Sequence, residues 1–219
     1  VKLAAVGEKL ELRARGPHVT PGYWRDPRRS ADAFDAEGFY RMGDAVRLID
    51  PQDPRRGLVF DGRIAEDFKL SSGSWVSVGP LRLGLLRELA PLAVDVVIAG
   101  LNRDYVAVLV LLDEQAAATL LGTPPRALST AQLSREPQLL RALAKRLERH
   151  ARSQLGSTTR VCRAAVLAEP PSLDRGEITD KGSLNQRLLL ERRAAAVDEL
   201  YGEIPPPHVI CVQPEQGLS

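Results

Sequence analysis

Cysteine, methionine and long apolar runs are scarce in this sequence, and each scarcity excludes a class of protein. The two cysteines, Cys162 and Cys211, lie far apart and show none of the Cys/His spacings of a zinc site, so cytosolic thiols are expected and a metal centre is not. The longest apolar stretches, such as residues 106–112, are far too short to span a bilayer. The N-terminus lacks the basic and apolar segments of a secretory signal, so a cytoplasmic location is expected. Met42 is the only methionine, so Val1 marks either a fragment boundary or an alternative start codon.

Neither sign of charge is in large excess. The 30 basic and 28 acidic residues leave a net charge of +2, which does not favour nucleic acid or an anionic membrane as the main partner. Hydrophobic residues make up 44% and charged residues 26% of the 219 residues, as is normal for a globular protein with a buried core.

The pattern of the chain predicts an α+β fold, because strands and helices do not alternate regularly. Residues 8–15 alternate strictly and predict a half-buried strand with Leu10, Leu12 and Ala14 on one face. A small β-rich unit ends near Gly62, where the pattern changes. The other expected elements are strands at 45–49, 58–60, 94–99, 105–112 and 161–167, a short hairpin at 68–78, and helices at 30–34, 80–89, 114–121, 136–155 and 185–201.

Asp44 and Arg63 are the first candidate binding residues. Asp44 follows Gly43 in an expected turn, where an exposed carboxylate can accept hydrogen bonds from two neighbouring hydroxyls of a ribose. Arg63 follows Gly62, and a guanidinium there can bridge a sugar or phosphate and a carboxylate. Taken alone, a turn-capping aspartate and a surface arginine are the alternatives.

Two lysines and a connector complete the candidates. Lys69 stands between apolar neighbours as a positioned charge or as a lysine extended along an apolar surface. Lys181 lies in a loop before the last expected helix, where it can reach an anion or simply face solvent. Ala65 and Glu66 are placed where a hinge can absorb a backbone rotation, or where an ordinary connector runs.

The order of four stretches carries a family resemblance. They are Gly-Pro-His-Val-Thr-Pro-Gly-Tyr-Trp at 16–24, Phe-Tyr-Arg-Met-Gly-Asp at 39–44, Gly-Arg-Ile-Ala-Glu-Asp-Phe-Lys at 62–69, and Ile-Thr-Asp-Lys at 178–181. In this order they resemble the C-terminal portion of the adenylate-forming superfamily of acyl-CoA synthetases, luciferases and peptide-synthetase adenylation domains. Met42 replaces the usual threonine, and Thr-Asp-Lys replaces the usual Ser-Gly-Lys. The amino-acid sequence of residues 62–80 and 175–187 is similar to that of feruloyl-CoA synthetase and related aryl-CoA ligases.

The resemblance implies a role for each candidate. Asp44 would bind the ribose hydroxyls of ATP and of the acyl-adenylate, and Arg63 would support the same ribose. Lys181 would stabilise charge at the α-phosphate during adenylation. The C-terminal lid would then rotate about Ala65 and Glu66, and its opposite face, with Lys69 and Gly73, would serve thioester formation with CoA.

The resemblance also implies how the chain is divided. Residues 1–62 would be the β-rich tail of the large adenylation domain, and 63–219 the mobile α+β lid with an enlarged helical insertion near 113–160. The phosphate loop and the acyl pocket do not occur in this sequence, so the rest of the adenylation domain would supply them and hold Mg²⁺. The implied function is an AMP-forming acid–thiol ligase acting on a carboxylic acid, with a feruloyl-like acid favoured, and the isolated chain is expected to be inactive. The alternative is a non-catalytic lid or regulatory module derived from this superfamily.

Overall fold

The computed structural model describes residues 1–154, 156–179 and 181–212. The fold is α+β, as the sequence predicts. The chain divides into two compact units, residues 1–67 and 68–219. Each unit has its own sheet, so each is described by itself.

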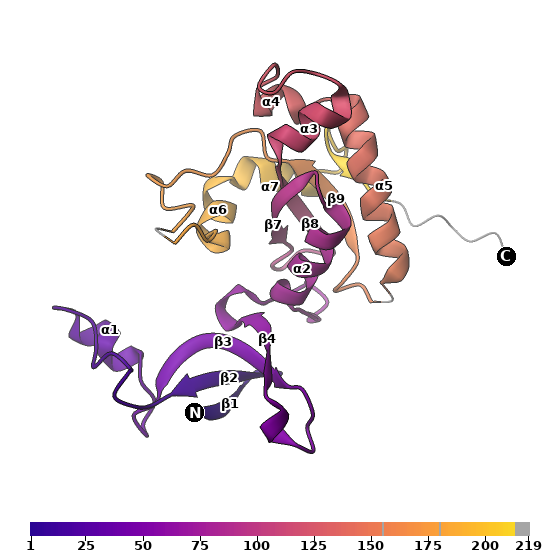
Figure 1. Cartoon of the computed structure of the whole chain (residues 1–219). Coiled ribbons are helices and arrows are strands. Elements are labelled where there is room, and N and C mark those ends of the chain that lie inside the picture. The colour runs from indigo at the N-terminus through magenta and orange to yellow at the C-terminus, as the bar shows by residue number, and fades with distance from the viewer. Residues whose placement is uncertain (155, 180, 213–219) are drawn as a thin grey trace. The chain divides into compact units, whose positions relative to one another are not determined.

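The first unit is built on an antiparallel sheet in the order β1-β2-β3-β4 (Figure 1). Its elements are β1 (Lys2–Val6), β2 (Lys9–Ala14), α1 (Pro27–Asp32), β3 (Tyr40–Leu48), η1 (Pro54–Arg56), β4 (Leu58–Arg63) and η2 (Ile64–Glu66). Helix α1 begins earlier than expected, because the Asp26 side chain accepts a hydrogen bond from the Arg29 amide and Pro27 suits the first helical position. Strand β1 was not expected from the sequence.

The buried residue of β2 is a glutamate. The sequence predicts a half-buried strand with Leu10, Leu12 and Ala14 on one face, and these three residues are half-buried, but the least exposed residue of the strand is Glu11, at 6%. The Glu11 carboxylate is hydrogen-bonded on both oxygens, to the Arg13 guanidinium at 2.8 Å and to the Gly43 amide at 3.2 Å. The predicted strand is therefore confirmed, and its most buried position is charged because a carboxylate with charged and amide partners can lie in the interior.

The second unit contains a hairpin and a four-stranded sheet. The hairpin pairs β5 (Phe68–Lys69) with β6 (Trp75–Val76), as expected. The sheet has the order β10-β9-β8-β7, and its strands are β7 (Ala93–Ala99), β8 (Val106–Leu112), β9 (Val161–Val166) and β10 (Ile210–Cys211). Strand β8 is buried along its whole length, which explains its unbroken apolar sequence.

Helices cover both faces of this sheet (Figure 1). They are α2 (Val78–Leu89), α3 (Glu114–Leu121), α4 (Thr130–Leu133), α5 (Pro137–Ser153), α6 (Gln186–Arg192) and α7 (Ala194–Tyr201). Val96 and Val108 belong to the core under α2 and α5, whereas Val97 and Leu109 belong to the core under α6 and α7. Successive residues of a strand thus pack into the cores on opposite faces of the sheet, as the two-residue period of a strand requires.

Helices α3, α4 and α5 form the connection between β8 and β9. These two strands are parallel, and a parallel pair needs a crossover of this kind. Helix α3 has the expected bounds because the Asp113 side chain caps its first turn and Gly122 ends it in the left-handed conformation (φ 66°).

The last helical segment differs from its prediction. One helix is expected over 185–201, but α6 and α7 are separate helices with Arg193 between them. The backbone of Arg193 (φ −101°, ψ 30°) departs from helical values, and its side chain turns towards the preceding loop. No helix in the described ranges is both long and apolar enough to cross a bilayer.

Candidate functional site

Asp44 and Arg63 face each other across two neighbouring strands of the first unit. Asp44 lies in β3 and is paired in register with Arg63, the last residue of β4. The Arg63 Nε and Asp44 Oδ1 atoms are 3.7 Å apart, and the two side chains are 65% and 29% exposed. Two residues predicted from separate motifs therefore form one charged, solvent-accessible pair.

The backbone at Asp44 is not the turn that the sequence predicts. Asp44 is inside a strand, at an irregularity in the β3–β4 pairing, and Gly43 precedes it with a φ of +72°. Glycine adopts this conformation at no steric cost, and such bulges redirect a neighbouring side chain. The turn prediction is corrected to a bulged strand, and the Glu11 carboxylate holds the Gly43 amide there.

A network of ion pairs that includes Glu11 was not predicted from the sequence. Arg13 bridges Glu11 and Asp35, with its Nη1 atom 3.0 Å from Asp35 Oδ2, and Lys2 Nζ lies 3.2 Å from the same oxygen. The hydrogen bond from the Phe39 amide, followed by those from the two cations, keeps the pKa of Asp35 far below its usual range despite the opposing effect of burial. The strict charge alternation at Glu11 and Arg13 was the available signal, but their partner Asp35 is distant in sequence.

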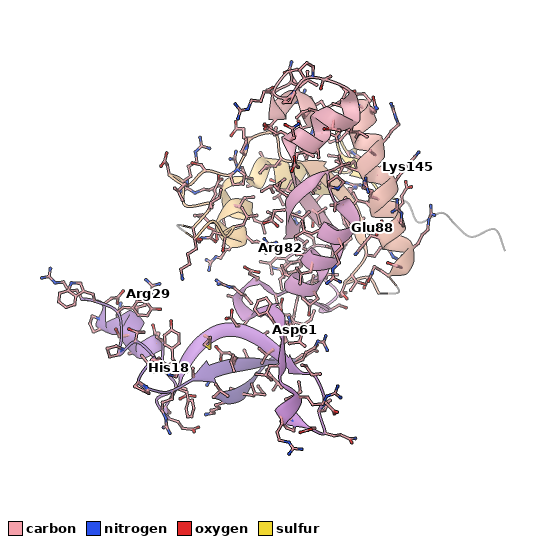
Figure 2. The ribbon with its side chains drawn as sticks, in the orientation of Figure 1. His18, Arg29, Asp61, Arg82, Glu88 and Lys145 are labelled. Atoms are coloured by element: carbon pink, nitrogen blue, oxygen red, sulfur yellow. The ribbon has the colours of Figure 1, made fainter. Side chains whose placement is uncertain are left out.

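The expected hinge residues lie at the end of the first unit. Ala65 and Glu66 belong to the short helix η2, and the division between the units follows Asp67. Lys9 Nζ contacts Asp67 Oδ2 at 2.6 Å and Asp61 Oδ2 at 3.5 Å (Asp61 is labelled in Figure 2). The segment up to Asp67 is therefore fastened to strand β2.

Lys181 lies in the second unit, in a loop closed by hydrogen bonds. Ile178 and Leu184 form an isolated antiparallel bridge, and the Thr179 amide donates to the Ser183 carbonyl at 2.8 Å. The Lys181 side chain is exposed. Its neighbour Asp180, which belongs to the same motif, lies outside the described residues. A hairpin-like loop thus presents the lysine to solvent.

Lys69 and Gly73 belong to the hairpin of the second unit. Lys69 is exposed, and its ammonium lies 5.0 Å from the ring centroid of Trp75 on the partner strand. Gly73 is in the turn with a φ of +82°, and a methyl group added there would meet no atom within 4 Å. The turn after β7 supports this hairpin, since the Asn102 amide donates to the Lys69 carbonyl at 3.0 Å. The hairpin can therefore offer a cation and an open backbone to a partner molecule.

The candidates are shared between the units. Asp44 and Arg63 belong to the first unit, and Lys69, Gly73 and Lys181 belong to the second. Within the described parts of the chain, no group of three or more His, Cys, Asp or Glu side chains has the arrangement of a metal site.

Proteins of known activity are similar to this chain over most of its length. A carboxylic acid reductase of Segniliparus rugosus is 24% identical over 196 residues, which cover 89% of this chain and 15% of that protein. The long-chain-fatty-acid–CoA ligase 1 of Cavia porcellus is 26% identical over 203 residues, covering 92% of this chain and 28% of that protein. This chain thus spans less than a third of the length of either relative, and no protein-family model matches it.

A solved structure shares the fold. It is the A domain of the Segniliparus rugosus carboxylic acid reductase, in complex with AMP and a co-purified carboxylic acid. The TM-score is 0.67 with 24% identity, and the match covers 87% of this chain and 28% of that one. The structural match shows that this chain shares the α+β fold of part of that A domain, consistent with the C-terminal portion of an adenylation domain.

Proposed function

We propose that this chain is the C-terminal part of a cytoplasmic, ATP-dependent acyl- or aryl-CoA ligase, with a feruloyl-like aromatic acid as the favoured substrate. In the first step a carboxylate oxygen attacks the α-phosphorus of ATP and pyrophosphate leaves. In the second step the CoA sulfur attacks the acyl carbon, and AMP leaves with the bonding electrons. The observation that carries the proposal is the pairing of Asp44 with Arg63 across β3 and β4 in this fold.

Asp44 has the properties of a ribose ligand. Its carboxylate is partly exposed and held at a bulge, so it can accept hydrogen bonds from two adjacent hydroxyls. The Arg63 guanidinium lies beside it with several donors still accessible to solvent, and it can contact the same sugar or its phosphate. The pair is therefore suited to a nucleotide rather than to stabilising the sheet.

Lys181 supplies the mobile positive charge in this proposal. An ammonium group placed beside the α-phosphate stabilises the charge that develops during adenylation. Rotation of the second unit about Ala65 and Glu66 then withdraws Lys181 and brings the Lys69 and Gly73 hairpin to the thiol substrate. Mg²⁺ would be held by ATP and by the portion of the adenylation domain outside this chain.

The first test is pyrophosphate exchange by the complete protein that contains this chain. With ATP and a panel of aromatic and aliphatic acids, Lys181→Ala should lower acid-dependent exchange about 100- to 1000-fold, as expected for loss of a charge-stabilising donor. Lys145→Ala is the matched control, since Lys145 is an exposed lysine of the same unit on α5 (Figure 2). Equal exchange in the two variants would reject the role of Lys181.

Asp44→Asn tests the nucleotide site separately. Loss of a charged acceptor costs about 1.5–3 kcal/mol, so the KM for ATP should rise roughly 10- to 100-fold while the KM for the acid changes little. Thioester formation on addition of CoA identifies the acceptor, and an enzyme that forms acyl-adenylate without this product is not a CoA ligase. The isolated chain should form no AMP, and acid-dependent AMP formation by it would contradict the proposal.

A further inference from the structure

A buried carboxylate stands close to Lys181 in sequence and has no role in the proposed chemistry. The Glu177 side chain is fully buried. Its Oε2 atom accepts hydrogen bonds from the Ser172 amide at 2.8 Å and from Arg193 Nη2 at 3.2 Å, and its Oε1 atom accepts one from Arg193 Nε at 3.1 Å. The contact with Arg193 is therefore a bidentate ion pair, a geometry that fixes the orientation of the carboxylate.

Arg193 connects this carboxylate to the break between α6 and α7. Its Nη1 atom lies 2.6 Å from Glu169 Oε2, and its guanidinium also donates to the Pro170 carbonyl at 3.5 Å. Burial on its own raises the pKa of Glu177, but the hydrogen bonds from Ser172 and Arg193 outweigh it and the net pKa is lowered. Glu177 is thus held as an anion, and one guanidinium fixes both ends of the segment from 169 to 177.

Backbone hydrogen bonds carry this constraint towards the lysine. The Glu177 carbonyl accepts from the Asn185 amide at 2.9 Å, so the two sides of the Lys181 loop are joined at its base. Further along, the Gly182 amide donates to the Thr179 carbonyl at 2.8 Å. Rotation of the Glu177 backbone would therefore displace the whole loop.

The helix on the other side of the loop is also fixed. The Asn185 side chain caps the first turn of α6 by accepting from the Leu188 amide at 3.2 Å. The buried Gln186 side chain accepts from the Ile98 amide of β7 at 3.2 Å. The base of the loop is thus held by Glu177 and Arg193 on one side and by the sheet on the other.

Stability alone does not account for a charged pair at this position. Well-packed apolar residues of similar volume often stabilise an interior as well as a buried ion pair, because the charges must be removed from water. A bidentate pair additionally fixes the orientation of the two side chains. We propose that Glu177 and Arg193 are positioning residues that hold the Lys181 loop in the conformation that delivers its ammonium group to the reacting phosphate, an inference that rests on the proposed function.

The test compares the two half-reactions in the complete protein. Glu177→Gln should lower pyrophosphate exchange about 10- to 100-fold, the loss expected when a reacting group is misplaced by about 1 Å. Transfer from a chemically prepared acyl-adenylate to the thiol should stay within about twofold, since it does not use Lys181. Arg193→Lys, which keeps the charge but cannot form both bonds, should lie between Glu177→Gln and the parent. Glu191→Gln is the control, because it removes an exposed ion pair with Arg187 on α6.

The Lys181→Ala background separates the possible outcomes. If Glu177 acts through Lys181, then Glu177→Gln has no further effect on exchange in that background. If it lowers both half-reactions equally, or lowers exchange in both backgrounds, its role is structural only and the inference is overturned. Unchanged exchange in Glu177→Gln, when Lys181→Ala is impaired, overturns the inference and leaves the proposed function standing. Unimpaired pyrophosphate exchange in Lys181→Ala overturns both the inference and the proposed function.

Discussion

Gly100 lies where the turn after β7 meets the hairpin that carries Lys69, and the structure predicts that Gly100→Ala destabilises the second unit. An added methyl group would lie 2.8 Å from Phe68 Cε2, 3.0 Å from Phe68 Cζ and 3.3 Å from Leu70 Cδ2. Carbon atoms in contact lie about 3.5–4.0 Å apart, so the ring would have to move by roughly 0.7 Å or more. Phe68 and Leu70 belong to the buried core, which leaves little room for this movement.

The same substitution at Gly84 should have the opposite effect. Gly84 lies inside α2, and a methyl group there would be 3.4 Å from the His150 Nε2 atom, an ordinary contact. Overpacking at Gly100 costs about 1–3 kcal/mol, whereas glycine to alanine in a helix gains about 0.5–1 kcal/mol. The two variants should therefore differ by roughly 1.5–4 kcal/mol in free energy of unfolding.

Tryptophan fluorescence can follow the second unit alone. The chain has two tryptophans; Trp24 belongs to the first unit and is 86% exposed, whereas Trp75 belongs to β6 of the second unit. In a Trp24→Phe background, the urea midpoints of the two glycine variants should be separated by on the order of 1 M. Equal midpoints, or a more stable Gly100→Ala variant, would refute the packing argument.

Two further predictions concern pH. Burial lowers the pKa of His150, although Glu88 on α2 (Figure 2) opposes the shift. The second unit should therefore keep its full stability above about pH 6.5 and lose part of it as the pH falls below that value. In urea titrations between about pH 7.5 and 5, His150→Leu should make the stability less dependent on pH. The hydrogen bonds to Asp35 lower its pKa, so the first unit should lose stability as the pH falls below about 3.9. Amide hydrogen exchange of residues 1–67, followed across this pH range, should show a weaker pH dependence of stability in Asp35→Asn, and an unchanged dependence would contradict the prediction.

Much of the fold could be predicted because its signals are local. The apolar run of β8 and the capped helix α3 are set by residues within the elements themselves, and both were located to within a residue or so. The α+β class followed from the order of such elements. The motifs also identified Asp44 and Arg63 as candidates, which the structure pairs across β3 and β4, and their binding role stays a prediction.

The rest depended on partners that are distant in sequence. The burial of Glu11 requires the Gly43 amide, and the break in the last helix occurs at Arg193, which pairs with Glu177. Periodicity assigns a residue to a face but does not say which distant group meets it there. The burial of Glu11 and the break in the helix expected over 185–201 therefore could not be predicted from the sequence, for the same physical reason.

The two ion pairs of the candidate site call for different kinds of proof. Asp44 and Arg63 are 3.7 Å apart and partly exposed, so their attraction contributes about 0–1 kcal/mol to stability. A large loss of nucleotide binding in Asp44→Asn without a shift in unfolding would therefore be a functional effect. Glu177 is buried against Arg193, and removing one partner of such a pair costs about 3–5 kcal/mol. Loss of exchange in Glu177→Gln alone would consequently be ambiguous; unchanged transfer to the thiol, together with the absence of a further effect in the Lys181→Ala background, assigns the loss to the position of the lysine.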